Sequence, residues 1–97
     1  MKTLLLSTAL AATTLIAAPA TAACFADYKA KQDNPLQLHY GVIELPDAAC
    51  GSAQDAAPEV SRRIAADGWT LLNVVSVFSD AGLEERKASA GTYFLRY

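Results

Sequence analysis

The residues whose types most specifically suggest chemistry in this chain are one histidine, His39, and two cysteines, Cys24 and Cys50. A histidine that acts as a general acid or base needs a partner group and a pocket. His39 is the only histidine, and it lies in a stretch that alternates like a β-strand. No Gly-x-Ser-x-Gly elbow, phosphate-binding glycine loop or His-Glu-x-x-His motif occurs. The sequence therefore predicts a protein that is not an enzyme and has no catalytic, cofactor-binding or metal-binding residues.

The two cysteines lie 26 positions apart and lack the Cys-x-x-Cys spacing of redox and zinc sites. In an exported protein, Cys24 and Cys50 most simply form a structural disulfide. By the chain-entropy estimate, a loop of this length contributes about 3.5 kcal/mol. Two alternatives stay open, a free thiol and a lipid on Cys24. The small residues before Cys24 suit lipidation, but Thr21 stands where a large aliphatic residue is expected.

The first 23 residues have the pattern of a secretory signal peptide. Lys2 is followed by an uncharged apolar run over residues 4–18 and then by small residues, which favour cleavage after Ala22 or Ala23. The run is shorter than the roughly 20 residues that a membrane-spanning helix needs. We therefore expect a periplasmic or secreted protein whose single small domain covers residues 24–97.

The charge of the expected mature domain excludes two classes of partner. Without Lys2, the domain has seven basic and ten acidic residues, which gives a net charge of −3. No cluster of Lys and Arg marks a nucleic-acid surface. No basic amphipathic face suits an anionic membrane, so membrane contact is expected only if Cys24 carries a lipid.

Three strands and one helix are expected in the mature domain. Residues 36–45 alternate as a first strand, and a helix begins at Asp55, with Ser52 as a second candidate for its N-cap. Gly68 stands where a left-handed C-cap belongs. The core face expected for the first strand holds Leu36, Leu38, Tyr40 and Val42, and its wetter face holds Gln37, His39 and Gly41.

The run from Gly68 to Phe78 is the longest β-prone stretch after the leader. It is mostly apolar on both alternating faces, which predicts a strand covered on both sides, and Trp69 is expected in the core. Residues 79–89 are expected to be a solvated hairpin loop that leads to a third strand over residues 90–97. Asn73 is polar on an apolar face and is expected to bond a facing strand.

This order, β-α-β-β, predicts an α+β fold: a small mixed three-stranded sheet with one helix, half of a ferredoxin-like unit. The crossover helix makes the first two strands parallel, and the hairpin makes the last two antiparallel. One helix covers one face of such a sheet, so the other face is an expected interface unless the segment 24–31 covers it. The interface residues predicted there are Leu72, Val74, Phe78 and Phe94.

The chain also resembles a known family over residues 38–97. A first strand that contains Tyr40, the Asp67-Gly68-Trp69 junction after a helix, and a last strand with an aromatic-Leu-Arg ending are similar to the short bacterial family of unknown function numbered 4177. Thr70 stands where that family usually has an acidic residue, and the leader and both cysteines are additions. The resemblance implies the fold and brings no activity with it.

Three functions from different classes follow. The first is a non-catalytic binding or self-association module of the periplasm, whose partner is a second copy or an envelope protein. The alternative is a secreted inhibitor or accessory subunit of an envelope enzyme, acting through a loop that the disulfide holds. A small enzyme is the third and least favoured reading, since His39 is its only candidate.

Overall fold

The computed structural model describes residues 23–97. The predicted signal peptide, apart from Ala23, lies outside the described residues. Short 3₁₀ turns connect the longer elements. These elements are β1 (Cys24–Gln32), β2 (Gln37–Leu45), α1 (Ala53–Ile64), β3 (Thr70–Ser79) and α2 (Glu84–Ala90).

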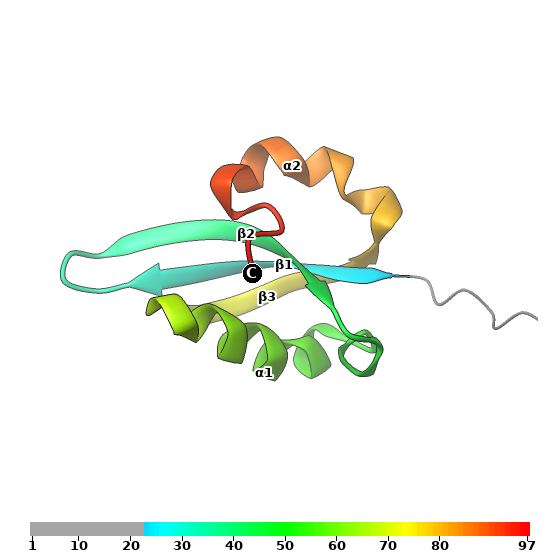
Figure 1. Cartoon of the computed structure of the whole chain (residues 1–97), viewed down its shortest axis with the longest axis horizontal. Coiled ribbons are helices and arrows are strands. Elements are labelled where there is room, and N and C mark those ends of the chain that lie inside the picture. The colour runs from blue at the N-terminus through cyan, green and yellow to red at the C-terminus, as the bar shows by residue number, and fades with distance from the viewer. Residues whose placement is uncertain (1–22) are drawn as a thin grey trace, which may run out of the picture.

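The three strands form one sheet in the order β2-β1-β3, and both pairs are antiparallel. Helix α1 lies against one face and α2 against the other (Figure 1). The α+β class and the three-stranded sheet are thus confirmed. The mixed sheet, the β-α-β-β order of half a ferredoxin-like unit and the single helix are wrong. The crossover through α1 does make β2 and β3 run in the same direction, but β1 lies between them, so they never pair.

The central strand is β1, a segment that the sequence did not predict as a strand. It forms a hairpin with β2 through the turn at residues 33–36 and pairs with β3 on its other side. Ala26, Tyr28 and Ala30 are fully buried against α1. Asp27, Lys29 and Lys31 alternate with these buried residues. Because charged residues are uncommon in the central strand of a sheet, the sequence did not indicate a strand here.

Strand β2 is present where predicted. Next to the hairpin turn its two faces are exchanged, whereas Val42, also expected in the core, is fully buried beneath α2. His39 is only 8% exposed, whereas Leu38 is 66% exposed. Tyr28 lies opposite Gly41 in the register of β1 with β2. A methyl group on Gly41 would lie 2.5 Å from the Tyr28 hydroxyl, so the glycine makes room for the tyrosine ring on this face. The face that holds Gly41 and His39 therefore lies on the α1 side of the sheet, with the ring of Tyr28.

Helix α1 begins and ends by the expected chemistry. Ser52 is the N-cap, and its Oγ accepts the backbone N–H of Asp55 at 3.1 Å. Asp55 is thus the third residue of the helix and not its cap. After a 3₁₀ turn the chain leaves at Gly68, whose φ of 83° is the left-handed conformation that the C-cap requires. Trp69 follows it and is 8% exposed, as predicted for a core residue.

Strand β3 carries two irregularities that change which residues face α1. Its register with β1 shifts between Asp27 and Tyr28 and again between Lys29 and Ala30, so Val75 and Leu72 have no partner in β1. Instead of every second residue, every third residue then packs against the core below α1. These residues are Leu71, Val74 and Val77.

The chain after β3 differs from the prediction. The expected hairpin loop contains α2, whose Ala90 is buried against Phe25 and Val42. The segment 90–97, expected as a third strand, instead contains the last residue of α2, a 3₁₀ turn over Gly91–Tyr93 and a C-terminal end that meets β2 by a single parallel bridge, Val42 to Phe94. A seven-residue helix is too short to be stable alone, so packing on the sheet determines its conformation.

The predicted disulfide is confirmed. Cys24 and Cys50 are bonded, with their Cα atoms 6.0 Å apart. The bond ties the start of β1, the central strand, to the loop before α1. A sulfur in this bond is not available for a lipid, so the structure favours the disulfide over the lipidated and free-thiol alternatives.

Candidate functional site

The α2 side of the sheet is covered over only half of its length. Helix α2 packs on the end of the sheet that contains Phe25, Val42 and Phe78. Beyond it, the hairpin of β1 and β2 continues without a helix above it (Figure 1). We call the uncovered half of this side the open face, and we define it by the side chains of Lys29, Leu38, Tyr40 and Leu72.

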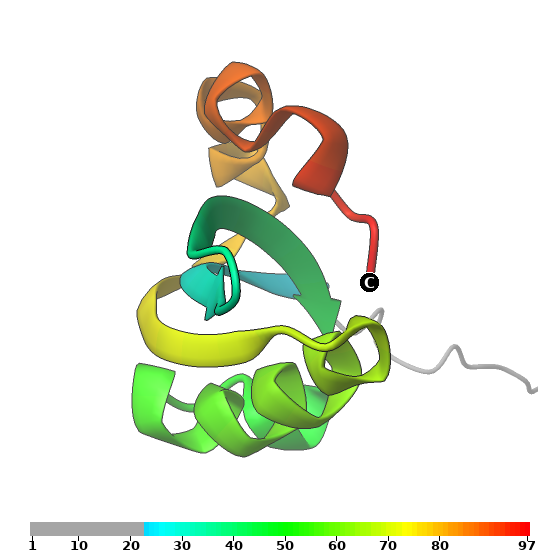
Figure 2. The same ribbon diagram turned by 90° about the vertical axis from the view of Figure 1, so that its left-hand side faces the viewer.

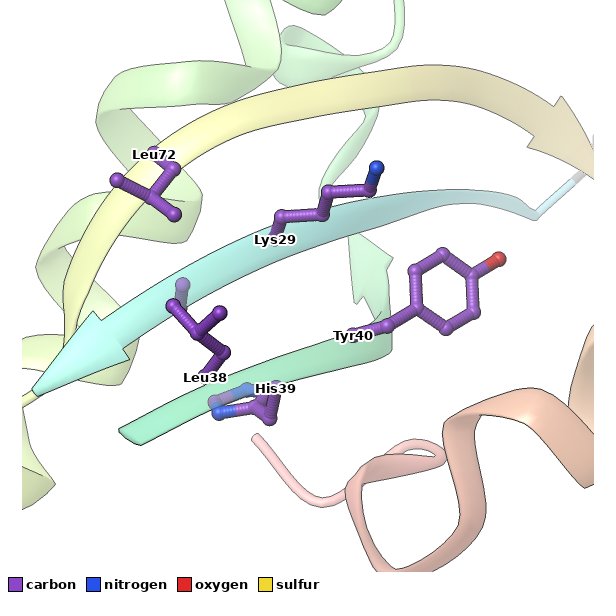
Figure 3. A pocket seen from close by; sticks show the side chains of 6 residues that line it. Lys29, Leu38, His39, Tyr40 and Leu72 are labelled. Atoms are coloured by element: carbon purple, nitrogen blue, oxygen red, sulfur yellow. The ribbon is translucent and has the colours of Figure 1, made fainter. Parts of the chain in front are cut away.

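The open face contains a hollow of about 340 Å³. Leu38 comes from β2 and Leu72 from β3, while Lys29 lies between them on β1 (Figure 3). Leu38 is 66% exposed and Leu72 is 50% exposed. Ala30 and His39 also border the hollow, but strand alternation directs them to the α1 side, where both are buried. Two large apolar side chains therefore stand in solvent on either side of a charged one.

The polar groups of the open face differ in whether they already have a hydrogen-bond or ion-pair partner within the described residues. None of the ion pairs within residues 23–97 involves Lys29, which is exposed. The Tyr40 hydroxyl donates to Asp27 Oδ2 at 2.7 Å, so the tyrosine offers its ring and not its hydroxyl to a ligand. The free ammonium of Lys29 is therefore the group of this face that can recognise an anion.

A buried carboxylate lies between the open face and α2. Asp27 is 4% exposed and accepts three hydrogen bonds, from Ser76 Oγ at 2.6 Å, from Tyr40 Oη and from Arg86 Nε at 3.1 Å. Arg86 also donates to the carbonyl of Gly82 and lies 3.9 Å from the centre of the Phe78 ring. These contacts join β1, β2 and β3 to α2 through one side chain.

The hydrogen bonds determine the ionisation of this group. Burial alone would raise the pKa of Asp27, but the bonds from Ser76, Tyr40 and Arg86 outweigh it and lower the pKa below its ordinary value. Burial, followed by the bond to Asp27, raises the pKa of Tyr40 to about 12. At neutral pH the cluster therefore holds a carboxylate, a neutral phenol and a guanidinium.

Replacing Arg86 with methionine is expected to lower the free energy of unfolding by about 2–3 kcal/mol, because a buried carboxylate loses its countercharge. The loss is smaller than for a fully buried pair, since Asp27 keeps its bonds to Ser76 and Tyr40. Urea denaturation at pH 7 measures it. Lys87→Met on the same helix, an exposed position, should change stability by no more than about 0.5 kcal/mol and serves as control.

The same cluster determines how the stability of the fold changes with pH. Because the folded pKa of Asp27 is lowered, its contribution to stability is complete above the unfolded value of about 3.9 and is lost as the pH falls through the folded pKa. Arg86→Met should lose part of this dependence, because the variant's Asp27 titrates closer to the unfolded value. Equal acid sensitivity in the two proteins would contradict the role given to Arg86.

His39, the one catalytic candidate, lies in an aromatic cluster on the α1 side. Its Nε2 is 3.0 Å from the Tyr28 hydroxyl, and its ring stacks on Tyr93 at 3.7 Å and meets Trp69 edge-on at 4.2 Å. Burial, helped by the nearby Arg96, lowers the pKa of His39. No hydrogen-bond partner is found for its Nδ1 among the described residues. The imidazole is thus buried and enclosed by aromatic rings, and its predicted place on the wetter face of the strand is wrong.

Residues 23–97 lack two further kinds of site. No group of three or more histidine, cysteine, aspartate or glutamate side chains in this part of the chain is arranged to hold a metal ion. No helix within the same residues is both long and apolar enough to span a membrane.

The four predicted interface residues do not form one surface. Leu72 borders the open face, whereas Val74 packs towards α1. Phe78 and Phe94 pack beneath α2, each half-buried. Asn73 lies opposite Lys29 of β1 and is exposed, and no side-chain hydrogen bond of Asn73 is found within residues 23–97, so the expected bond to a facing strand is not seen there. Sequence reasoning missed two residues of the open face, Lys29 and Leu38. The alternation of apolar and charged residues over 26–31 would have placed Lys29 outside the core. Leu38 alternates out of step with Ile43 and Leu45, which would have placed it on the opposite face from them.

Comparison of the chain with protein-family models, curated proteins and solved structures finds no match. The resemblance to the family numbered 4177 therefore stays a prediction. What the fold and the site define is a class: a small α+β domain, tied by one disulfide, with one half of a sheet face open to solvent.

Proposed function

We propose that this protein is a non-catalytic binding module of an oxidising, exported compartment and that it holds a segment of a partner protein on the open face. One observation carries the proposal: Leu38 and Leu72 are at least half exposed on opposite sides of the same hollow. Apolar side chains that gather around a hollow are typical of recognition surfaces. The disulfide suits an oxidising compartment.

The chemistry of the face indicates the kind of segment that fits. Leu38, Leu72 and the ring of Tyr40 favour an apolar side chain, and the ammonium of Lys29 favours a carboxylate beside it. The segment that best satisfies both is a short peptide with an aliphatic or aromatic residue next to Asp or Glu. A face of this size supports weak binding, with a dissociation constant on the order of micromolar.

Leu38→Lys is expected to weaken the binding of such peptides by about tenfold or more, because it removes an apolar contact worth about 1.5–3 kcal/mol and adds a second cation beside Lys29. The measurement is selection from a random peptide library on the oxidised protein, followed by titration of the enriched peptides. Leu95→Lys is the matched control. Leu95 is 43% exposed but belongs to the C-terminal segment and not to the open face.

Two outcomes would count against the proposal. One is a selection that enriches no apolar and acidic sequence. The other is a set of enriched peptides that bind wild type and Leu38→Lys equally well. Because Leu38 is mostly exposed, the variant should keep the stability of the wild type, and a thermal melt verifies that lost binding is not lost folding.

A further inference from the structure

The two outer edges of the sheet differ in what covers their backbone. On β2, the carbonyl of Val42 accepts the N–H of Leu95 at 2.8 Å, and the carbonyl of Glu44 accepts the Arg63 guanidinium at 2.7 Å. On β3, the described residues provide no hydrogen-bond partner beyond β1. Figure 2 shows β3, in yellow, at the margin of the sheet opposite the red C-terminal segment.

The open edge has few of the features that normally prevent strands from pairing. Proteins protect exposed edges with charged side chains, prolines or very short strands. Strand β3 has ten residues, Thr70–Ser79, and none of them is charged or is proline. Its two register shifts are the only protective feature, and the two residues they leave unpaired, Leu72 and Val75, are apolar and about half exposed.

We propose that β3 pairs with β3 of a second copy of this chain, antiparallel and about a two-fold axis, to give a continuous six-stranded sheet. An uncharged strand meets its own copy without repulsion. On the β2 edge the carbonyls of Val42 and Glu44 are already bonded to Leu95 and Arg63, whereas β3 has no such contact along its length among the described residues. Association then stops at a closed dimer, with the same surface used twice, and does not continue into a filament.

This inference goes beyond the proposed function, because it rests on the edge of the sheet and not on the open face. The two are related in space. A two-fold axis that continues an antiparallel sheet runs perpendicular to it, so both open faces come to lie on the same side of the dimer. Leu72 lies at the β3 border of each open face. The dimer therefore presents two peptide sites next to each other, which strengthens the binding of a partner with two suitable segments.

Sedimentation velocity of the oxidised protein, produced from the full-length chain, tests the pairing over about 1 to 500 μM, the range expected for a small interface. We expect a concentration-dependent monomer–dimer equilibrium in the wild type. Val75→Lys should raise the dissociation constant by at least about tenfold, since it introduces a charge at the edge of both copies. Leu38→Lys, which alters the open face of β2, should dimerise like the wild type.

Hydrogen–deuterium exchange of the wild type gives a second measurement that needs no variant. Amides within residues 70–79 should become more protected as the protein concentration rises, while those of β2 should not change. A protein that stays monomeric throughout, or a dimer that Leu38→Lys dissociates and Val75→Lys does not, would overturn the proposal. So would concentration-dependent protection confined to other elements. Loss of peptide binding in Leu38→Lys with dimerisation intact separates this inference from the proposed function.

Discussion

Trp69→Ala is expected to lower the free energy of unfolding by about 3–5 kcal/mol, the cost of removing a large buried aromatic side chain. Trp69 is 8% exposed and belongs to the core cluster that includes Val60 and Ile64 of α1. It also meets the rings of His39 and Tyr93 edge-on, at 4.2 and 5.7 Å. Its loss therefore opens a cavity where the helix, the sheet and the C-terminal segment meet.

Urea denaturation followed by far-ultraviolet circular dichroism measures this effect, because the variant has no tryptophan fluorescence. Leu72→Ala is the matched control. Leu72 lies in the adjoining strand but is half exposed, so we expect a loss below about 1 kcal/mol. If Trp69→Ala were as stable as Leu72→Ala, the tryptophan would be a surface group and its assignment to the core would fail.

Removal of the disulfide by the double substitution Cys24→Ala and Cys50→Ala is expected to cost about 3.5 kcal/mol by the chain-entropy estimate for the loop that the bond closes. The two cysteines are separated by 26 positions. The bond holds the first residue of the central strand, so the unlinked chain loses its restraint at the end of β1 where both neighbouring strands pair. A domain this small draws a large part of its stability from such a link.

Thermal and urea unfolding of the oxidised wild type, the reduced wild type and the double variant measure this contribution. The reduced protein should match the variant, because both lack the bond while only one has changed side chains. A loss below about 1 kcal/mol in both would show that the unfolded chain gains little freedom when the link is removed.

The junction between α1 and β3 illustrates what local sequence can predict. Ser52 and Gly68 have conformational preferences that act within one turn of the chain. Gly68 ends the helix as expected, whereas the N-cap is Ser52, the second candidate, and not Asp55. Trp69 was predicted in the core from the glycine before it and the apolar run after it. The pairing of Cys24 with Cys50 required only that the chain hold two cysteines in an oxidising compartment.

The central position of β1 illustrates the opposite case. Asp27 at the middle of a sheet contradicts local preference, and the side chain that compensates it, Arg86, lies 59 residues later in the chain. Sequence reading of 24–32 finds charged residues and no strand. The compensation exists only once α2 packs on the sheet, and α2 is too short to be stable without that packing.

The open face could not be located from the pattern of β3 because the two bulges break its alternation. With strict alternation, Leu72 and Val74 share a face; the register shifts direct Val74 to the core and leave Leu72 in solvent. In β2 the alternation was read correctly and Val42 is buried as expected, but His39 and Leu38 are exchanged, because nothing local shows that the ring of Tyr28 fills the space above Gly41.

Local chemistry in the chain thus establishes the disulfide, the ends of α1, the buried tryptophan and the α+β class, since each depends on residues close in sequence or on composition. The central strand, the inner face of each strand, the helix α2 and the exposed edge of β3 depend on contacts between residues far apart in the chain. Both surfaces proposed here for function, the open face and the β3 edge, belong to this second group. They are regions of the sheet that no helix or neighbouring strand covers within the described residues, and only the three-dimensional arrangement of those elements shows where they lie.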